Sequence, residues 1–145
     1  MRNMKITIEW KVCRSYKEAE DFQNGVYLFE WWNGRPFYWG VVDKAIFGGN
    51  PRKVNGVKVN PRYGRSYKHL ISGFLRHGGM LYFGKLNYKK DKKFVLTNLE
   101  NFLINKYPSE ENKEVEPVTG KLEVIHIGNI PSSIIWGELA ERALK

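Results

Sequence analysis

The segment NGVYLFEWWNGRPFYWGVVD, residues 24–43, limits the possible folds more than any other part of the chain. Two apolar, aromatic-rich runs flank Asn33-Gly34, a dipeptide typical of tight hairpin turns because both residues tolerate positive φ. Pro36 indicates that part of the second run lies at a sheet edge, since proline has no N–H to donate to a ladder. The segment therefore predicts an antiparallel hairpin that holds Tyr27 and Tyr38 side by side.

The rest of the pattern predicts one small α+β domain. Alternating or apolar runs predict strands at about 5–12, 25–32, 36–43, 80–86 and 121–127. Apolar residues at helical spacing, with capping residues or prolines near the ends, predict helices at 15–24, 65–77, 97–107 and 131–145. Between them, residues 44–63 form a loop rich in Gly, Asn and Pro, with a second hairpin turn at Asn55-Gly56. The chain of 145 residues is long enough to bury one core.

The positive charge is concentrated in one third of the chain. The net charge is +9, and the segment 44–90 contains no Asp or Glu. This segment carries eleven basic residues: Lys44, Arg52, Lys53, Lys58, Arg62, Arg65, Lys68, Arg76, Lys85, Lys89 and Lys90. Basic residues bind phosphates and release condensed counterions, so a nucleic acid is the first expected partner. A basic, solvated surface without a specific partner is the alternative.

Several classes of protein are disfavoured by composition. The single cysteine, Cys13, excludes an internal disulfide and a cysteine-based zinc site. The N-terminal segment is charged throughout and lacks the apolar centre of a signal peptide, and no apolar run approaches membrane-spanning length. We therefore expect a soluble, cytoplasmic protein without a membrane partner.

The ordered set of residues that follows the hairpin resembles the GIY-YIG endonuclease family. GVY at 25–27 and YWG at 38–40 are similar to the two signatures of that family, and LENFLINKYPSEEN at 99–112 is similar to its Glu-bearing helix, proline and distal Asn. Arg65 opens the intervening helix, and His69, four residues later, is similar to a histidine of restriction-type members. The resemblance covers about residues 24–113.

This resemblance implies a specific architecture. It implies a small central three-stranded antiparallel sheet flanked by helices, within a nuclease core at 24–115. Residues 1–23 and 116–145 would be strand–helix extensions, the second packed on the core. Val26 and Trp39 replace the isoleucine of each signature, and the basic loop is an insertion relative to the simplest members.

The resemblance also implies a metal-dependent hydrolysis of DNA phosphodiester bonds. Glu100 would bind Mg²⁺ or Mn²⁺, for which a hard carboxylate oxygen is suited. Arg65 would hold the scissile phosphate, Tyr27 would act as the base or water-orienting group, and Tyr38 would position water or phosphate. A free phenol has a pKa of about 10, so Tyr27 would need perturbing neighbours to act near neutral pH.

Supporting roles follow for the remaining residues. If Arg65 starts its helix, His69 lies one turn later on the same face and could help to hold Tyr27 or the phosphate. Asn112 would orient Glu100 or bridge the helix end. The expected contacts with the nucleic acid come from basic residues in and after the loop: Lys44, Arg52, Lys53, Lys58, Arg62 and Lys68.

Each assignment has a structural alternative. Thr97 and Glu100 have capping-box spacing, so Glu100 could be a helix cap. Arg62 competes with Arg65, the tyrosines could be core aromatics, and His69 could be a satisfied surface histidine. Glu111-Asn112-Lys113, with Asp91, fits half of a restriction-fold motif, but that chemistry requires a strand.

Two other function classes stay open. Aromatic residues interleaved with basic ones could form a non-catalytic module that binds DNA or RNA without a metal. A purely structural protein could use Trp31, Trp32 or the C-terminal helix as an interface. A homodimer is a further expectation, because one active centre cuts one strand and a two-fold pair would cut both.

Overall fold

The computed structural model describes residues 3–19, 22–43, 47, 52–59, 71–87, 92–112 and 121–143. The elements within these ranges are β1 (Asn3–Cys13), α1 (Tyr16–Ala19), β2 (Gly25–Glu30), β3 (Pro36–Val42), β4 (Arg52–Val54), β5 (Val57–Val59), β6 (Met80–Leu86), α3 (Lys92–Lys106), β7 (Lys121–Gly128) and α4 (Ser132–Ala143). Residues 71–76 are also helical. None of the described helices has both the length and the apolar character that crossing a membrane requires.

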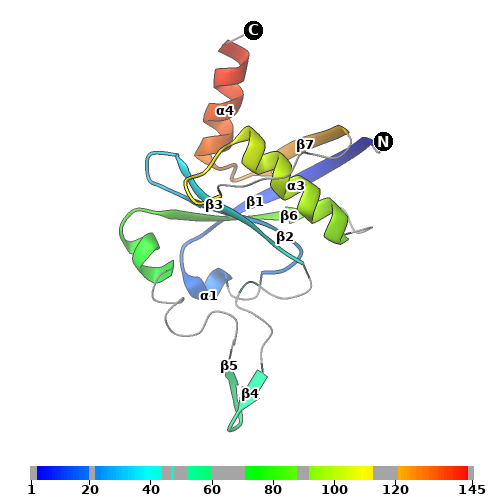
Figure 1. Ribbon diagram of the computed structural model, residues 1–145. Helices are drawn as coiled ribbons and strands as arrows, with labels where there is room; N and C mark the ends of the chain where they lie inside the picture. The colour runs from blue at the N-terminus through cyan, green and yellow to red at the C-terminus, as the bar shows by residue number, and fades with distance from the viewer. Residues whose placement is uncertain are drawn as a thin grey trace.

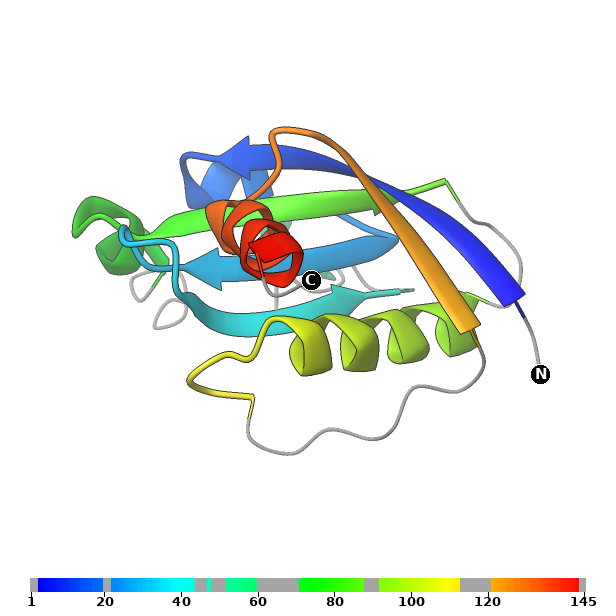
Figure 2. The same ribbon diagram turned by 90° about the horizontal axis from the view of Figure 1, so that it is seen from above.

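Five strands form one mixed sheet in the order β3-β2-β6-β1-β7. The three pairs formed by β3, β2, β6 and β1 are antiparallel, and β7 runs parallel to β1 (Figures 1 and 2). The expected α+β class is confirmed, whereas the expected sheet of only three strands is not confirmed, because the sheet has five. The antiparallel trio β3-β2-β6 is present, but β1 and β7, from the regions that we expected to be extensions, continue the same sheet. β1 is an interior strand because it pairs with both β6 and β7, and its alternating side chains Met4, Ile6, Ile8 and Trp10 are buried.

Both faces of the sheet are covered at β2, because this interior strand is buried along its whole length. Val26 and Leu28 join a core with α3 and α4 on one face. Tyr27 and Phe29 join a second core on the opposite face, together with Phe47. Figure 1 shows α3 and α4 on one side of the sheet, with α1 and the β4–β5 hairpin on the other.

Local sequence signals set most of the element ends. Asn55 and Gly56 have φ of 52° and 78°, so the predicted second hairpin turn is confirmed. Gly34 has φ of 82° in the turn between β2 and β3, a conformation that glycine adopts without a steric penalty. The helix expected at 15–24 is shorter, and Ser15 caps it by accepting a hydrogen bond from the Glu18 N–H at 3.3 Å.

Helix α3 begins five residues earlier than the expected helix at 97–107. Val95 and Leu96 are buried against the sheet, so the apolar stripe extends the helix towards its N-terminus. Thr97 and Glu100 consequently lie inside α3. The capping-box alternative for Glu100 is therefore wrong.

Helix α4 is attached to the sheet by a buried carboxylate. Glu30, at the end of β2, is 1% exposed and accepts hydrogen bonds from the Ser133 N–H at 2.9 Å and the Ser133 hydroxyl at 2.8 Å. The carboxylate thus caps an N-terminal N–H of the helix, where negative charge is favourable. This contact fixes the N-terminal end of α4 to β2.

The adjacent Trp31-Trp32 pair divides between packing and solvent. Trp31 packs against Phe37 and Phe74 and donates its indole N–H to Glu110 at 2.9 Å. Trp32 is 78% exposed.

His126 on β7 predicts a pH dependence of stability. Its Nδ1 accepts the Trp10 indole N–H at 2.9 Å, and burial lowers the pKa of His126 to about 4. The unfolded chain therefore binds a proton near pH 6.5 that the folded chain does not, and stability falls as the pH drops from about 6.5 to about 4. We expect this histidine to account for a loss of up to about 3 kcal/mol over that range.

Urea unfolding of the parent and of His126→Gln between pH 7 and pH 4 measures this effect. The glutamine retains an acceptor for Trp10 but does not titrate, so its stability should fall less. Equal pH dependence in the two proteins would show that His126 is not the titrating group.

Candidate functional site at the edge of strand β3

Tyr27 lies across the edge strand β3. Tyr27 on β2 pairs with Gly40 on β3, and a Cβ atom at position 40 would overlap the Cζ and hydroxyl oxygen of Tyr27. The phenol ring therefore extends over the bare backbone of Gly40. The rest of the ring packs edge-on against Phe29, Phe47 and Phe83, and Tyr27 is only 5% exposed.

Tyr38 is the neighbour of Tyr27, as the sequence predicts. The two ring centroids are 6.1 Å apart and the ring planes are inclined by 43°. Tyr38 pairs with Phe29 across the hairpin and is partly exposed on β3. The predicted side-by-side placement is confirmed, and the catalytic roles of the two phenols stay predictions.

Asn112 closes the outer edge of β3 beside these tyrosines. Its side-chain oxygen accepts the Trp39 N–H at 2.7 Å, and its side-chain nitrogen donates to the Trp39 carbonyl at 3.0 Å. The Ser109 hydroxyl donates to the same amide oxygen at 2.5 Å. The amide thus bonds both main-chain groups of the residue between Tyr38 and Gly40. Ser109 was not among the residues predicted from the sequence, although its spacing of three residues from Asn112 is typical of a side-chain turn.

Trp39 is the bulky residue that replaces the isoleucine of the second signature, and its packing explains this replacement. Its side chain is buried on the face of the sheet opposite the tyrosines, and its indole N–H donates to the Tyr107 carbonyl at 2.9 Å. This bond fixes the C-terminal end of α3 to β3. The chain between that end and Asn112 is therefore held at the edge of the same strand.

Glu100 lies on the flank of α3 that faces away from α4. Lys106 contacts α4 through Glu138 and Glu141, and a separation of six residues places Glu100 on the other side of the buried stripe. The contacts of α3 with the sheet are mainly with β3. Burial raises the pKa of the Glu100 carboxyl above its usual value, and no hydrogen bond or ion pair to it is found within the described ranges. The carboxylate is thus partly desolvated on the helix that covers the Trp39 face of the sheet, whereas Tyr27 and Tyr38 belong to the opposite face.

The remaining candidate residues are not placed. Lys44, Arg62, Arg65, Lys68 and His69 lie outside the described residues. Of Arg52, Lys53 and Lys58, only the backbone in the β4–β5 hairpin is described. Asp91 and Lys113 of the restriction-fold alternative are also outside, and Glu111 and Asn112 lie on no strand, contrary to what that motif requires.

The described residues contain no preformed cluster of metal ligands. Among them, no group of three or more His, Cys, Asp or Glu side chains converges. A single carboxylate still fits Mg²⁺, which keeps several waters and takes one or two carboxylates together with substrate phosphates. Glu100, with its desolvated oxygens, is consistent with this mode, and it would be the metal ligand.

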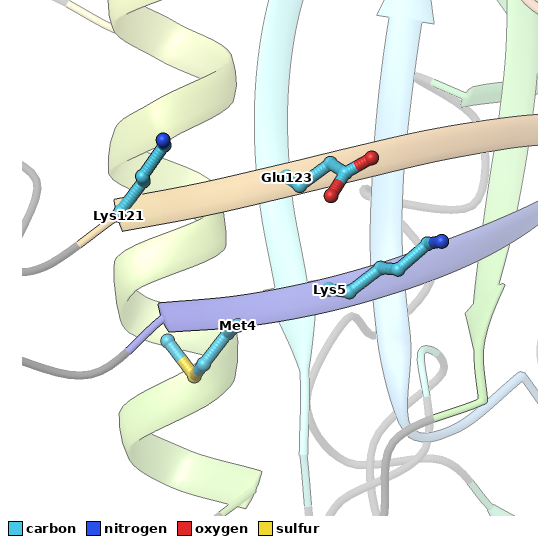
Figure 3. Close-up of a pocket in the computed structure, with 4 residues that line it drawn as sticks. All are labelled: Met4, Lys5, Lys121 and Glu123. Carbon is cyan, nitrogen blue, oxygen red and sulfur yellow. The ribbon is translucent and has the colours of Figure 1, made fainter.

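A pocket of about 240 Å³ at the beginning of β1 and β7 is a poorer candidate. It is lined by Met4, Lys5, Lys121 and Glu123, and Lys5 pairs with Glu123 in the strand register (Figure 3). Because Lys5 and Lys121 lie beside the Glu123 carboxylate, the pocket is disfavoured as a binding site for a metal cation. The β3 edge is therefore the stronger candidate site.

Comparisons with known proteins do not identify a relative. No family model, no curated protein and no solved structure matches the chain.

Replacement of Gly40 tests the contact with Tyr27. Gly40→Ala introduces a Cβ atom where the Tyr27 ring lies, so we expect a loss of about 1–3 kcal/mol from overpacking. The matched control is Gly73→Ala, because position 73 is helical and has no atom within 4 Å of the added Cβ. That control should gain about 0.5–1 kcal/mol from helix propensity. Urea unfolding measures the stability of both variants. A Gly40→Ala protein as stable as the parent would disprove the placement of Tyr27.

Replacement of Glu100 tests its desolvation. Because the folded-state pKa is raised, ionisation opposes folding at pH values above the folded pKa, and the penalty vanishes below the unfolded pKa. Glu100→Gln should therefore raise the Tm at pH 7, and the gain should shrink as the pH falls towards 4. Glu123→Gln, at an exposed position of β7, is the control; it can lose only a solvent-exposed attraction to Lys5 and Lys121, so it should not raise the Tm. A lower Tm for Glu100→Gln at pH 7 would mean that the carboxylate has a stabilising partner.

Proposed function

We propose that the chain is a metal-dependent endonuclease that hydrolyses DNA phosphodiester bonds. The observation that carries this proposal is the convergence at β3 of the Tyr27 hydroxyl over Gly40, the Tyr38 ring and the Asn112 amide. These are three of the residues that the resemblance to GIY-YIG nucleases selects. The strand also supports α3, which carries Glu100.

Each side chain would have a distinct task. Tyr27 would orient the attacking water through its phenol oxygen and, as the phenolate, accept its proton, and Tyr38 would position that water or the phosphate. The phenyl rings around Tyr27 hold its ring in one orientation, which favours a fixed direction for the hydroxyl. Asn112 would act by holding the main chain of Trp39, and thereby the spacing of Tyr38 and Gly40.

Two charged groups would complete the site. Arg65 would bind the scissile phosphate, and His69 would support it or Tyr27. Mg²⁺ or Mn²⁺ held by Glu100 would stabilise the charge that develops on the leaving oxygen. The partly desolvated setting of Glu100 strengthens its attraction for a cation.

The partner that we propose is DNA, with RNA as the alternative. The segment 44–90 carries eleven basic and no acidic residues, so it would supply the phosphate contacts. A homodimer would let two centres act on opposite strands.

One observation favours a second candidate function. Tyr27 is 5% exposed, which is a usual condition for a structural tyrosine. The second candidate is a non-catalytic module that binds nucleic acid through the same basic segment, without a metal. It predicts binding that is insensitive to Glu100.

Cleavage of supercoiled plasmid separates the two. With Mg²⁺, the parent should nick and linearise the plasmid, and EDTA should abolish cutting. Glu100→Gln should cut at least about 100-fold more slowly, because the ligand for the charge-stabilising ion is lost. Tyr27→Phe keeps the ring and its packing and should lose about 100-fold or more through loss of the hydroxyl.

The control is Glu123→Gln, which removes one carboxylate elsewhere and should cut at the parent rate. Gel-shift measurements on the same proteins should show similar DNA affinity. Tight binding without cutting, equal in the parent and in Glu100→Gln, would reject the nuclease and support the binding module.

A further inference from the structure

Helix α4 directs two of its carboxylates, those of Glu138 and Glu141, towards the end of α3. Glu138 accepts a hydrogen bond from the Tyr107 hydroxyl at 2.6 Å and pairs with the Lys106 ammonium at 3.0 Å. Glu141 pairs with the same ammonium at 3.5 Å. Gly137 lies directly against the Tyr107 ring. One side of the helix is therefore joined to the end of α3 by charged groups.

The opposite side of α4 is apolar and faces solvent. Ile135 and Leu139 are each 47% exposed, and Trp136 is 65% exposed. Ala140 and Ala143 are also exposed and share this side by helical spacing. A surface helix ordinarily has the reverse arrangement, with its apolar side towards the core. Figure 1 shows α4 standing out from the sheet, with its C-terminal end farthest from it.

We propose that this side of α4 pairs with the same side of α4 in a second copy of the chain, antiparallel about a two-fold axis at Leu139. The proposal does not depend on the nuclease activity. A contiguous exposed apolar surface marks an interaction site, and a two-fold pair needs one self-complementary surface only.

The distribution of side-chain size along the helix favours a second copy in the antiparallel orientation. The bulky Ile135 and Trp136 lie in the first half, and the small Ala140 and Ala143 lie in the second half. In an antiparallel pair, Trp136 falls opposite the two alanines of the second copy, and Leu139 meets its counterpart. A parallel pair would place Trp136 on Trp136 and leave the alanines facing a gap. Close packing requires large residues opposite small ones.

A groove beside α4 adjoins this surface, and its lining combines isoleucine and leucine side chains with Glu138, Arg142 and His126. Ile135, Leu139 and Arg142 form one wall, and Ile130 and His126 lie on the β7 side, around a volume of about 310 Å³. In the antiparallel pair, Ile135 of the second copy packs near the aliphatic part of Arg142. The second helix would thus contact more than one helix face.

The size of the surface indicates a reversible dimer. A helix of 12 residues is about 18 Å long, and one face of each helix buries less than the roughly 1,200 Å² of a typical stable interface. We expect a dissociation constant of about 1–100 μM.

Sedimentation equilibrium of the full chain between about 1 and 300 μM tests this range. The parent should change from monomer to dimer. Leu139→Arg should raise the dissociation constant about 100-fold or more, because a symmetric interface contains the change twice. The matched control is Phe94→Arg, an exposed apolar residue of α3, which should dimerise like the parent. Glu100→Gln should also dimerise, which separates this test from that of the nuclease.

Disulfide cross-linking tests the orientation. Cys13 is buried and burial raises the pKa of its thiol to about 12, so it can remain in place. Leu139→Cys should cross-link to itself. Ala143→Cys should not, because the two Cα atoms would be about 12 Å apart along the antiparallel helices, beyond disulfide reach.

Three results would overturn the proposal. The first is a monomer over the whole concentration range, and the second is a dimer that Leu139→Arg leaves intact. The third is self-cross-linking of Ala143→Cys, which would require a parallel pair. A monomer whose tryptophan emission shifts to the blue on vesicles of phosphatidylglycerol and phosphatidylcholine would instead assign the surface to a membrane.

Discussion

The burial of β2 on both sides is the constraint on which the rest of the structure depends. All six of its residues are buried, so other elements must pack against each face of the sheet. Val26 and Leu28 lie under α3 and α4, whereas Tyr27 and Phe29 pack with Phe47 on the opposite side. Trp39 on β3 joins the first core and holds α3 through its bond to Tyr107. The arrangement places a charged helix and two phenols on opposite faces of the same edge strand.

The candidate site follows from the way in which this edge is closed. Asn112 bonds both main-chain groups of Trp39, and the N–H groups of Glu110 and Glu111 donate to the carbonyls of Pro36 and Phe37. The edge is thereby protected from pairing with another strand. Gly40 leaves room at this edge for the Tyr27 ring, so the glycine and the tyrosine form one unit. Burial raises the pKa of the Glu100 carboxyl on α3, the helix that covers the opposite face of this edge strand.

Local patterns in the sequence predict a large part of this fold. The turns at Asn33-Gly34 and Asn55-Gly56, the strands around them and the Tyr27–Tyr38 pair follow from turn chemistry and from a period of two. The parallel pairing of β1 with β7 joins segments more than 100 residues apart, and no local signal specifies it. For the same reason, the bond between Asn112 and Trp39 emerges only in the folded chain, whereas the early start of α3 continues a local apolar stripe through Val95 and Leu96. The assignments of Arg65 and His69 stay predictions, since both lie outside the described residues.

The most direct test of the proposed site is the broadening of amide NMR signals by Mn²⁺. The paramagnetic ion broadens signals close to its binding position, whether or not the protein cuts DNA. We predict that substoichiometric Mn²⁺ broadens the signals of Tyr38, Gly40 and Glu100 first, and that excess Mg²⁺ restores them. Broadening centred on Glu138 and Glu141, or spread evenly over exposed carboxylates, would contradict a metal site at the edge of β3.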